Sequence, residues 1–269
     1  MHPRPERETL QGLYTERYFE QGTYQGRYSE THGQPDHIPP VWTKILLACK
    51  RRQPQGRLLD IGCAHGFFLY AAAQHGFTPC GVELVPEAVA HARSLGYSLH
   101  CGDLHSARYQ TNSFDVVTML DVIEHLWDPL EEVKEVARVL RPGGLFGVLT
   151  PNAWQTRLRG MRWRGFRQSF EHVLFFEPNT IAHLLRIAGF EVVETFTCQP
   201  NLAAGWVRRV GTSLKIDALS VARQARLPVW KKALRKQWQA LNRAALWLPE
   251  ELLFGHMLFV LARLPKRAG

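Results

Sequence analysis

The stretch LLDIGCAHGFFL, residues 58–69, has the order of features typical of a strand, a tight turn and a helix. Its apolar start suits a buried strand, and the turn after it carries Gly62, Ala64 and Gly66. An apolar helical pattern begins at Phe67. In a doubly wound α/β sheet the first strand-to-helix turn helps to form the ligand site. The stretch therefore predicts both the fold class and the position of the site.

The rest of the chain repeats this alternation of short apolar runs and helical patterns, which is typical of a parallel sheet covered by helices. Asp128 and Pro129 suit the N-cap and the first position of one helix, which is expected to end at the RPGG motif of residues 141–144. Residues 151–176 lack a clean period and are predicted as a long loop. Strands are expected at 57–62, 78–84, 98–103, 114–120, 145–150, 190–197 and 257–264.

The composition, with 45% hydrophobic and 21% charged residues among 269, is that of a soluble globular protein. Its five cysteines are scattered and lack CxxC spacing, which argues against a disulfide framework and favours a reduced cytoplasmic setting. The N-terminus has no apolar signal segment, and the late apolar run HMLFVLA is too short to span a bilayer. We expect a cytoplasmic protein that does not cross a membrane, and the sequence indicates no particular oligomeric state.

The net charge of +9 is concentrated in two segments. Residues 206–243 contain ten Lys or Arg and one acid, and residues 157–167 contain five Arg and no acid, so the rest of the chain is mildly acidic. Trp230, Leu234 and Trp238 fall on one helical face, apart from most of the basic residues. Such a helix could cover the active site as a cap, dock on an anionic membrane surface at the inner face of a membrane, or bind nucleic acid.

Four segments are predicted along the chain. The first, residues 1–57, is expected to be an ordered arm and a helix, because five aromatic residues between Tyr14 and Tyr28 are more than a disordered tail typically carries. The others are a ligand-binding core at 58–199, a basic amphipathic helical insert at 200–252, and a final strand at 253–269 that completes the core.

The glycine turn does not match a phosphate-binding loop. A dinucleotide site would need G-x-G-x-x-G, whereas this turn is Gly62-x-Ala64-x-Gly66, and no Gly-Lys-Ser/Thr follows as in a P-loop. Asp60 stands just before the turn. Its carboxylate would repel a pyrophosphate but could orient a ligand that carries an amino group.

Acidic residues also end the following strands. Glu83 ends the second strand, where a carboxylate can accept hydrogen bonds from a ribose diol. Asp103 ends the third strand, within reach of an adenine amino group, and Asp121 and Glu124 follow the fourth. The implied ligand carries adenosine and an amine and no phosphate.

Five motifs, in this order and spacing, resemble those of class I S-adenosylmethionine-dependent methyltransferases. They are most similar to the group that contains the ubiquinone-type O-methyltransferases and other small-molecule methyltransferases. The resemblance covers residues 58–197, and the late run GHMLFVLAR is similar to the antiparallel last strand of that family. It implies a Rossmann-like, mostly parallel seven-stranded sheet. The motifs are LLDIGCAHG, GVEL, CGDLH, FDVVTMLDVIEHLWDP and LRPGGLFGVLTPN.

The resemblance implies S-adenosylmethionine as the cofactor. Glu83 would hold the ribose, Asp103 and Leu104 the adenine, and Leu120 would lie on the methyl-bearing side. Ala64 departs from the family's Asp-x-Gly-x-Gly-x-Gly turn; an added methyl group matters only where the backbone needs a positive φ or a close approach, so we expect retained binding. The methionine part would be lined by Asp60, Gly62, Ala64 and Gly66.

Methyl transfer depends largely on holding the nucleophile and the methyl group at attack geometry, and a hydroxyl acceptor also benefits from a base. His125, just past the fourth strand, is one candidate base, with a structural role in the turn as the alternative. His172, in the long loop, is the second. Trp163, Tyr24 or Tyr28 could shield a sulfonium by cation–π contact, or simply pack.

A divalent metal is a further alternative. Asp121, Glu124 and His125 could bind one together, and the ubiquinone-pathway relatives are similar at these positions. Hard cations require several convergent oxygen ligands, and this stretch supplies few. We therefore do not expect a metal from these three residues.

The leading hypothesis is O-methylation of a small-molecule or lipid-linked acceptor, such as a quinone precursor, a natural product or a sugar. Methylation of RNA or DNA is an alternative that draws on the basic segments, although the chain reads MLDV where base amino-methylating enzymes carry Asn/Asp-Pro-Pro-aromatic. A non-catalytic methyltransferase-like scaffold is the third alternative, against which Gly62, Gly66 and Glu83 argue.

Overall fold

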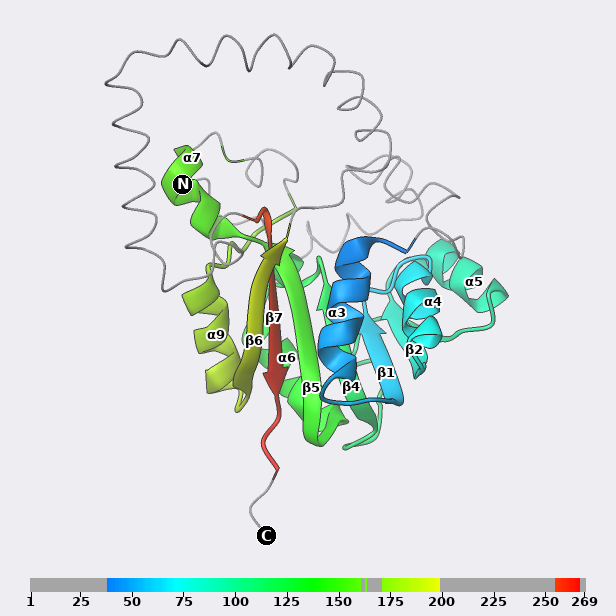
Figure 1. Ribbon diagram of the computed structural model, residues 1–269. Coiled ribbons are helices and arrows are strands. Elements are labelled where there is room, and N and C mark those ends of the chain that lie inside the picture. Colours follow the sequence, from blue (N-terminus) through cyan, green and yellow to red (C-terminus); the bar gives the residue numbers. More distant parts are fainter. Residues whose placement is uncertain (1–37, 161–162, 164–170, 199–254, 267–269) are drawn as a thin grey trace, which may run out of the picture.

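The computed structural model describes residues 38–160, 163, 171–198 and 255–266, and their strands form a single sheet (Figure 1). Its strands are β1 (Gly56–Ile61), β2 (Phe77–Glu83), β3 (Ser98–Cys101), β4 (Phe114–Leu120), β5 (Leu140–Pro151), β6 (Glu191–Cys198) and β7 (Met257–Arg263).

The strand order across the sheet is β3-β2-β1-β4-β5-β7-β6. The pairs among β1 to β5 are parallel, whereas β7 runs antiparallel to both of its neighbours, β5 and β6. The order reverses between β1 and β4, as in other doubly wound sheets. The predicted α/β fold, with a mostly parallel seven-stranded sheet and an antiparallel last strand, is confirmed.

Helices cover both faces of this sheet, which explains why a central strand such as β4 is mostly apolar and buried on both sides. On one face, α6 and α9 pack against strand residues that include Leu59 and Val117. On the other face, α3 and α4 pack against Leu58 and Val116. The helices are α3 (Pro40–Lys50), α4 (Phe67–Gln74), α5 (Pro86–Ser94), α6 (Pro129–Val139), α7 (Thr156–Arg159) and α9 (Pro178–Ile187), with 3₁₀ turns η2 (Ile123–His125) and η3 (Ala153–Gln155).

The start of α6 follows the predicted capping pattern. Asp128 is the N-cap, its Oδ1 accepts hydrogen bonds from the backbone N–H groups of Leu130 and Glu131, and Pro129 occupies the first helical position. Such a cap satisfies donors that the helix itself leaves unpaired. The helix that follows β4 is therefore fixed at its N-terminus, close to the site described below.

Two predictions about the middle of the chain are wrong. The fifth strand begins at Leu140 rather than at residue 145, because Leu140 already pairs with Phe114 before a bulge shifts the register of the two strands. The RPGG motif thus lies inside β5, where Gly143 takes up a positive φ of 87°. Residues 151–176 are not a loop without regular structure, since η3 and α7 lie within them and Asn152 forms a bridge with Phe176.

Several predicted segments lie outside the described residues. These are the N-terminal arm with Tyr24 and Tyr28, the basic insert at 200–252 and most of the Arg-rich run at 157–167, so their expected roles stay predictions. Within the described ranges, every helix is too short or too polar to cross a lipid bilayer.

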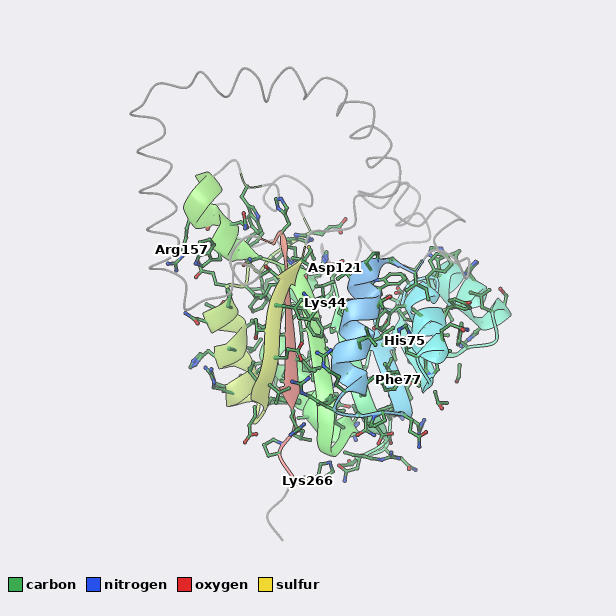
Figure 2. The ribbon with its side chains drawn as sticks, viewed as in Figure 1. Lys44, His75, Phe77, Asp121, Arg157 and Lys266 are labelled. Carbon is green, nitrogen blue, oxygen red and sulfur yellow. The ribbon has the colours of Figure 1, made fainter. Side chains whose placement is uncertain are left out.

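The carboxyl ends of the parallel strands meet at one edge of the sheet. Figure 2 shows Asp121, just after β4, at this edge, while Lys266 lies at the opposite end. Ligands of doubly wound sheets bind at the carboxyl edge, where the strand order reverses. The glycine turn after β1 and the acidic residues after β2, β3 and β4 therefore converge on one region.

Candidate cofactor and acceptor site

The turn between β1 and α4 is built from three residues with positive φ, namely Gly62 at 72°, Ala64 at 46° and Gly66 at 82°. A Cβ on Gly62 would lie 2.5 Å from Val122 Cγ2, and one on Gly66 would lie 2.7 Å from Ala92 Cβ. Both distances are below van der Waals contact, so these two glycines are required by space as well as by conformation.

Ala64 has a positive φ, which is a condition under which the methyl group of an alanine matters. The residue sits in the left-handed region, which costs an alanine about 1 kcal/mol or more relative to a right-handed conformation. Its backbone N–H donates a hydrogen bond of 2.9 Å to Glu83 Oε2. That bond compensates part of the strain and ties the turn to the end of β2.

Glu83 holds two backbone groups at once. Its Oε2 accepts from Ala64 N–H at 2.9 Å and its Oε1 from Val85 N–H at 3.0 Å, and the side chain is buried. Burial raises the pKa of Glu83, while these hydrogen bonds oppose the rise. Each carboxylate oxygen accepts more than one hydrogen bond, so the residue can clamp the turn and still accept from a ribose diol.

Asp60 is buried at the end of β1, directly before the turn. The Thr118 hydroxyl of β4 donates to its Oδ1 at 2.6 Å. Burial nevertheless raises the pKa of Asp60 to about 7, and the nearby charge of Glu83 adds to the rise. A carboxylate so poorly solvated favours a cationic partner beside it. The contact of Asp60 to the amino group of the cofactor stays a prediction.

Asp103 shapes the loop after β3. Its Oδ1 accepts the Ser106 N–H at 2.7 Å, and the Ser106 hydroxyl donates to the Asp103 carbonyl at 2.9 Å. Although partial burial opposes it, the hydrogen bonds from Ser106 lower the pKa of Asp103. Leu104 is fully buried in the core cluster, so this residue fixes the loop in the position from which Asp103 would face the adenine.

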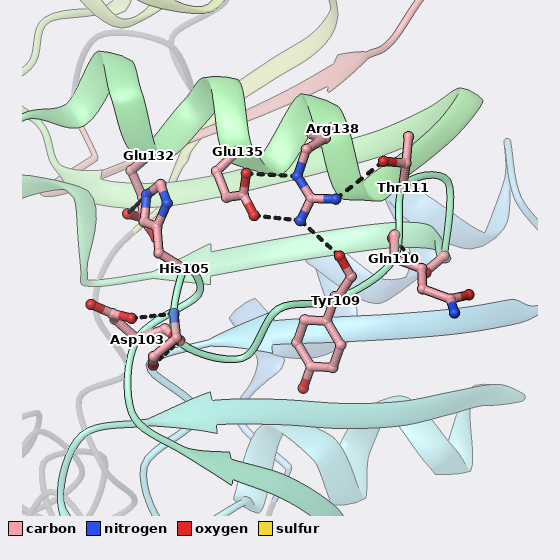
Figure 3. Close-up of polar contacts among 10 residues, drawn as sticks. Asp103, His105, Tyr109, Gln110, Thr111, Glu132, Glu135 and Arg138 are labelled. Carbon is pink, nitrogen blue, oxygen red and sulfur yellow. Dashed lines mark hydrogen bonds and ion pairs between the residues drawn. The ribbon is translucent and has the colours of Figure 1, made fainter.

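The same loop is bound to α6 by polar contacts that Figure 3 shows. Arg138 donates to the Tyr109 carbonyl at 2.7 Å and to Thr111 Oγ1 at 3.1 Å, and it pairs with Glu135. His105 Nε2 lies 3.3 Å from Glu132 Oε2. The adenine side of the predicted site is thus positioned by α6.

A second group of polar side chains follows β4. The 3₁₀ turn η2 carries Glu124 and His125, and the Glu124 carbonyl accepts the backbone N–H groups of Val173 and Leu174 at 3.0 and 3.1 Å. These two bonds dock the segment that contains His172. The rings of His125 and His172 meet edge to face, with centroids 4.8 Å apart.

Glu124 is almost completely buried. The Thr150 hydroxyl of β5 donates to its Oε2 at 2.9 Å, and its Oε1 lies 3.9 Å from His172 Nε2. Burial, strengthened by the charge of Asp121, raises the pKa of Glu124 well above its usual value. Burial and the neighbouring His172 lower the pKa of His125 to about 3, so His125 is neutral at physiological pH.

This group contains unused polar atoms. Among the described residues, neither Glu124 Oε1 nor the two ring nitrogens of His125 have a hydrogen-bond partner, although His125 Nδ1 is 4.0 Å from Glu171 Oε2. Buried polar atoms are normally satisfied. The arrangement therefore provides acceptors for a hydroxyl group or ligands for a cation.

The fold brings together a different set of possible metal ligands from the set considered from the sequence. Among the described residues, Glu124, His125 and His172 carry possible metal-ligand atoms that lie within 4.8 Å of one another. This set includes His172 and not Asp121. With one carboxylate and two imidazoles, this set does not suit a hard cation such as Mg²⁺, which prefers oxygen ligands. The Asp121, Glu124 and His125 set is not the one that converges.

Trp163 packs inside the protein. It is buried, and its ring meets Phe175 edge to face at 5.7 Å. This contact supports the packing alternative over a cation–π role.

Leu120, the predicted neighbour of the methyl group, ends β4 immediately before Asp121, whose positive φ of 57° turns the chain toward η2.

Three residues that the sequence analysis did not single out support the site. Thr118 and Thr150 donate their hydroxyls to Asp60 and Glu124. Gly255 accepts from Asn152 Nδ2 at 3.1 Å and leaves no room for a Cβ beside Cys198 and Thr197. A polar residue inside an apolar strand was the available signal for both threonines; none was available for Gly255.

Comparison with known proteins identifies the family of the chain. Residues 36–195 match the family described as "Methyltransferase domain". The chain is 34% identical to a probable S-adenosylmethionine-dependent methyltransferase of Mycolicibacterium smegmatis over 58% of each chain. It is 30% identical to a ubiquinone biosynthesis O-methyltransferase of Aromatoleum aromaticum over 63% of this chain and 78% of that one.

A solved structure shows the same fold. The S-adenosylmethionine-dependent methyltransferase of Archaeoglobus fulgidus aligns with a TM-score of 0.57 at 17% identity, over 83% of this chain and 93% of the other. The matched part spans only 58% of the Mycolicibacterium relative. The family match covers more than half of the present chain, so the chain belongs to the methyltransferase domain family, as its motifs predict.

Proposed function

Starting from its membership of the methyltransferase domain family, we propose that the chain transfers the methyl group of S-adenosylmethionine to a hydroxyl oxygen of a small or lipid-linked acceptor, such as a quinone precursor. The observation that carries this proposal is the edge-to-face contact of His125, which is buried just after β4, with the partly buried His172. The ubiquinone biosynthesis O-methyltransferase named above supports the choice of oxygen.

The turn side of the site would hold the cofactor. Asp60, buried and poorly solvated, would receive the ammonium group, and Glu83 the ribose diol. Gly62 and Gly66 allow the backbone to approach the ligand closely, because no Cβ projects from them. These contacts fix the donor so that its methyl group lies near Leu120, at the end of β4.

The histidine side would hold the acceptor. The ring nitrogens of His125 have no hydrogen-bond partner among the described residues, so His125 would accept the proton of a hydroxyl group as the oxygen gains the methyl group. Burial and His172 lower the pKa of His125 to about 3, so this role requires a negative charge beside the ring that raises its pKa. The positive charge of the sulfonium then passes to the imidazole. Glu124 and His172 lie beside that ring, and the carboxyl group can stabilise the charge.

The test is a turnover assay with the full chain, S-adenosylmethionine and a panel of catechols, phenols, sugars and hydroxylated lipids. Formation of S-adenosylhomocysteine together with an acceptor that has gained one methyl group is the expected result. His125→Ala and His172→Ala should lower kcat by 10²-fold or more if either ring is the base. His183→Ala, at an exposed position of α9, is the matched control.

Two results would oppose the proposal. Unchanged kcat in both histidine variants would remove them as bases for the true acceptor. Methylation of a ring carbon of the phenols or catechols, with no O-methylated product from any member of the panel, would reject the oxygen chemistry but leave the cofactor assignment intact.

A further inference from the structure

The peptide group between His65 and Gly66, inside the glycine turn, is held at both of its polar atoms. Nδ1 of His91, which belongs to α5, lies 3.0 Å from the carbonyl oxygen of His65. The backbone N–H of Gly66 donates to the carbonyl of Cys63 at 3.0 Å. One bond comes from within the turn, whereas the other comes from the helix that follows β2.

The partner atom fixes the proton of the His91 ring. A carbonyl oxygen can only accept a hydrogen bond, so Nδ1 of His91 must carry the hydrogen atom in this contact. The neutral ring therefore takes the Nδ1–H tautomer, and its Nε2 is left as the acceptor. The contact thus predicts a property of His91 that can be measured in solution.

Aromatic contacts orient the ring of His91. It meets the ring of His65 edge to face with centroids 5.3 Å apart, and the ring of Phe67 in the same manner at 5.5 Å. The rings of His65 and Phe67 stack at 5.9 Å. Edge-to-face contacts are a preferred arrangement of aromatic rings. They favour the ring orientation in which Nδ1 reaches the carbonyl.

Two small residues let α5 approach the turn closely. A Cβ on Gly66 would lie 2.7 Å from the Cβ of Ala92, the residue after His91. Ala92 is completely buried, so the helix lies directly against the turn at this point. The position of His91 is therefore set by the packing of its neighbour.

The peptide group needs this support because Gly66 offers little resistance to its rotation. Gly66 has a φ of 82° and no Cβ, and glycine adopts positive and negative φ about equally readily. A rotation would exchange the directions of the His65 carbonyl and the Gly66 N–H and break both hydrogen bonds. The N–H of Ala64, by contrast, is held by the side chain of Glu83.

From this geometry we infer that His91 is a positioning residue for the cofactor turn, whose Nδ1–H holds the His65 carbonyl toward α5 and keeps the turn in one shape before the ligand binds. The inference rests on the proposed cofactor site, since Gly62, Ala64 and Gly66 are expected to line the methionine part. The role of His91 is indirect. A turn held in the bound shape raises affinity, because less ordering is required on binding.

The first test uses the full-length protein without cofactor. NMR of the histidine ring nitrogens should show the Nδ1–H tautomer for neutral His91. Amide hydrogen exchange should be faster at Gly66 in His91→Ala by about fivefold, the factor that one net hydrogen bond supplies. His91→Asn should restore wild-type exchange, because the amide nitrogen of asparagine takes the place of Nδ1. His91 lies at an exposed position, so both variants should fold.

The second test measures S-adenosylmethionine affinity by calorimetry. His91→Ala should bind about fivefold more weakly than wild type, and His91→Asn should bind as wild type does. His75→Ala is the matched control. Nδ1 of His75 lies 2.8 Å from the Ala71 carbonyl within the α4 region, so this variant loses the same type of contact away from the turn. It should change neither Gly66 exchange nor affinity.

Three results would overturn the inference. They are an Nε2–H tautomer at neutral His91, Gly66 exchange in His91→Ala equal to that in His75→Ala, and a loss of affinity that His91→Asn does not restore. The last would mark His91 as a packing residue. Gly66 exchange that depends on His91, in a chain whose wild type binds no S-adenosylmethionine, would support the positioning of the turn and count against the proposed function alone.

Discussion

The carboxylate of Glu83 accepts the backbone N–H of Ala64 at 2.9 Å, although Ala64 lies at a φ of 46°. The end of β2 thereby holds an L-residue in a conformation that glycine normally supplies. The departure from the family's glycine pattern is accommodated by a side chain that is itself predicted to bind the cofactor. Four predictions follow from this part of the molecule and from the contacts around it.

Ala64→Gly should stabilise the protein. The change relieves the left-handed strain of about 1–2 kcal/mol but increases the entropy of the unfolded chain. The net expectation is a rise of about 0.5–1 kcal/mol in the free energy of unfolding, measured by urea denaturation. Ala73→Gly, inside α4, should have the opposite sign by about 1 kcal/mol. A destabilised Ala64→Gly variant would contradict the account of strain.

Glu83→Gln should weaken cofactor binding by at least tenfold, because hydrogen bonds to a charged acceptor contribute about 1.5–3 kcal/mol. An amide group also replaces one acceptor oxygen by a donor, which opposes the N–H of Ala64 or of Val85. Calorimetric titration with S-adenosylmethionine measures the effect. Glu87→Gln, at an exposed position in the first turn of α5, is the control and should bind as wild type does.

The raised pKa of Asp60 predicts that the free energy of unfolding depends on pH. Its pKa is about 7 in the folded protein and 3.8 in the reference state, so between these values the folded state holds a proton that the unfolded chain has released. The free energy of unfolding of the cofactor-free protein should therefore fall as pH rises from about 4 to 7, by up to about 4 kcal/mol from this group.

Asp60→Asn removes this titration. The difference in the free energy of unfolding between wild type and the variant should change from about pH 4 to 7, with wild type losing stability faster as pH increases, and should level off above that range. Parallel pH profiles of the two proteins would show that Asp60 ionises normally.

Arg138→Ala should destabilise the protein by about 1–2 kcal/mol, because the Tyr109 carbonyl and Thr111 lose their donor and the loop after β3 loses its tie to α6. Lys134→Ala is a matched control on the same helix. Lys134 and Glu131 form an exposed i,i+3 pair, and its loss should change the free energy of unfolding by less than about 0.5 kcal/mol. Equal effects in urea denaturation would show that Arg138 acts as an ordinary surface charge.

Much of the sheet could be predicted because its signals are local. The apolar run of β4 matches the predicted 114–120, and the glycines after β1 occupy a strand-to-helix turn whose geometry requires them. The start of β5 could not be predicted in this way. Leu140 belongs to the strand only because Phe114 pairs with it across a bulge.

The supporting residues of the site depend on contacts that are distant in sequence. Thr118 meets Asp60 because β1 and β4 pair in one particular register. His172 joins Glu124 and His125 because two backbone hydrogen bonds dock its segment on η2. The residue types were visible in the sequence, but the pairing was not.

The place of β7 also governs the order in which the sheet can form during synthesis. β6 is made before β7, yet the sheet pairs it with β7 alone, and β7 also covers the open side of β5. Until Met257–Arg263 leaves the ribosome, both neighbours present unpaired edges, and the buried side chains of β7 are missing from both faces. A nascent chain stalled before β7 would therefore be a substrate for chaperones or proteases, even with every residue of the glycine turn, and with Glu124, His125 and His172, already made.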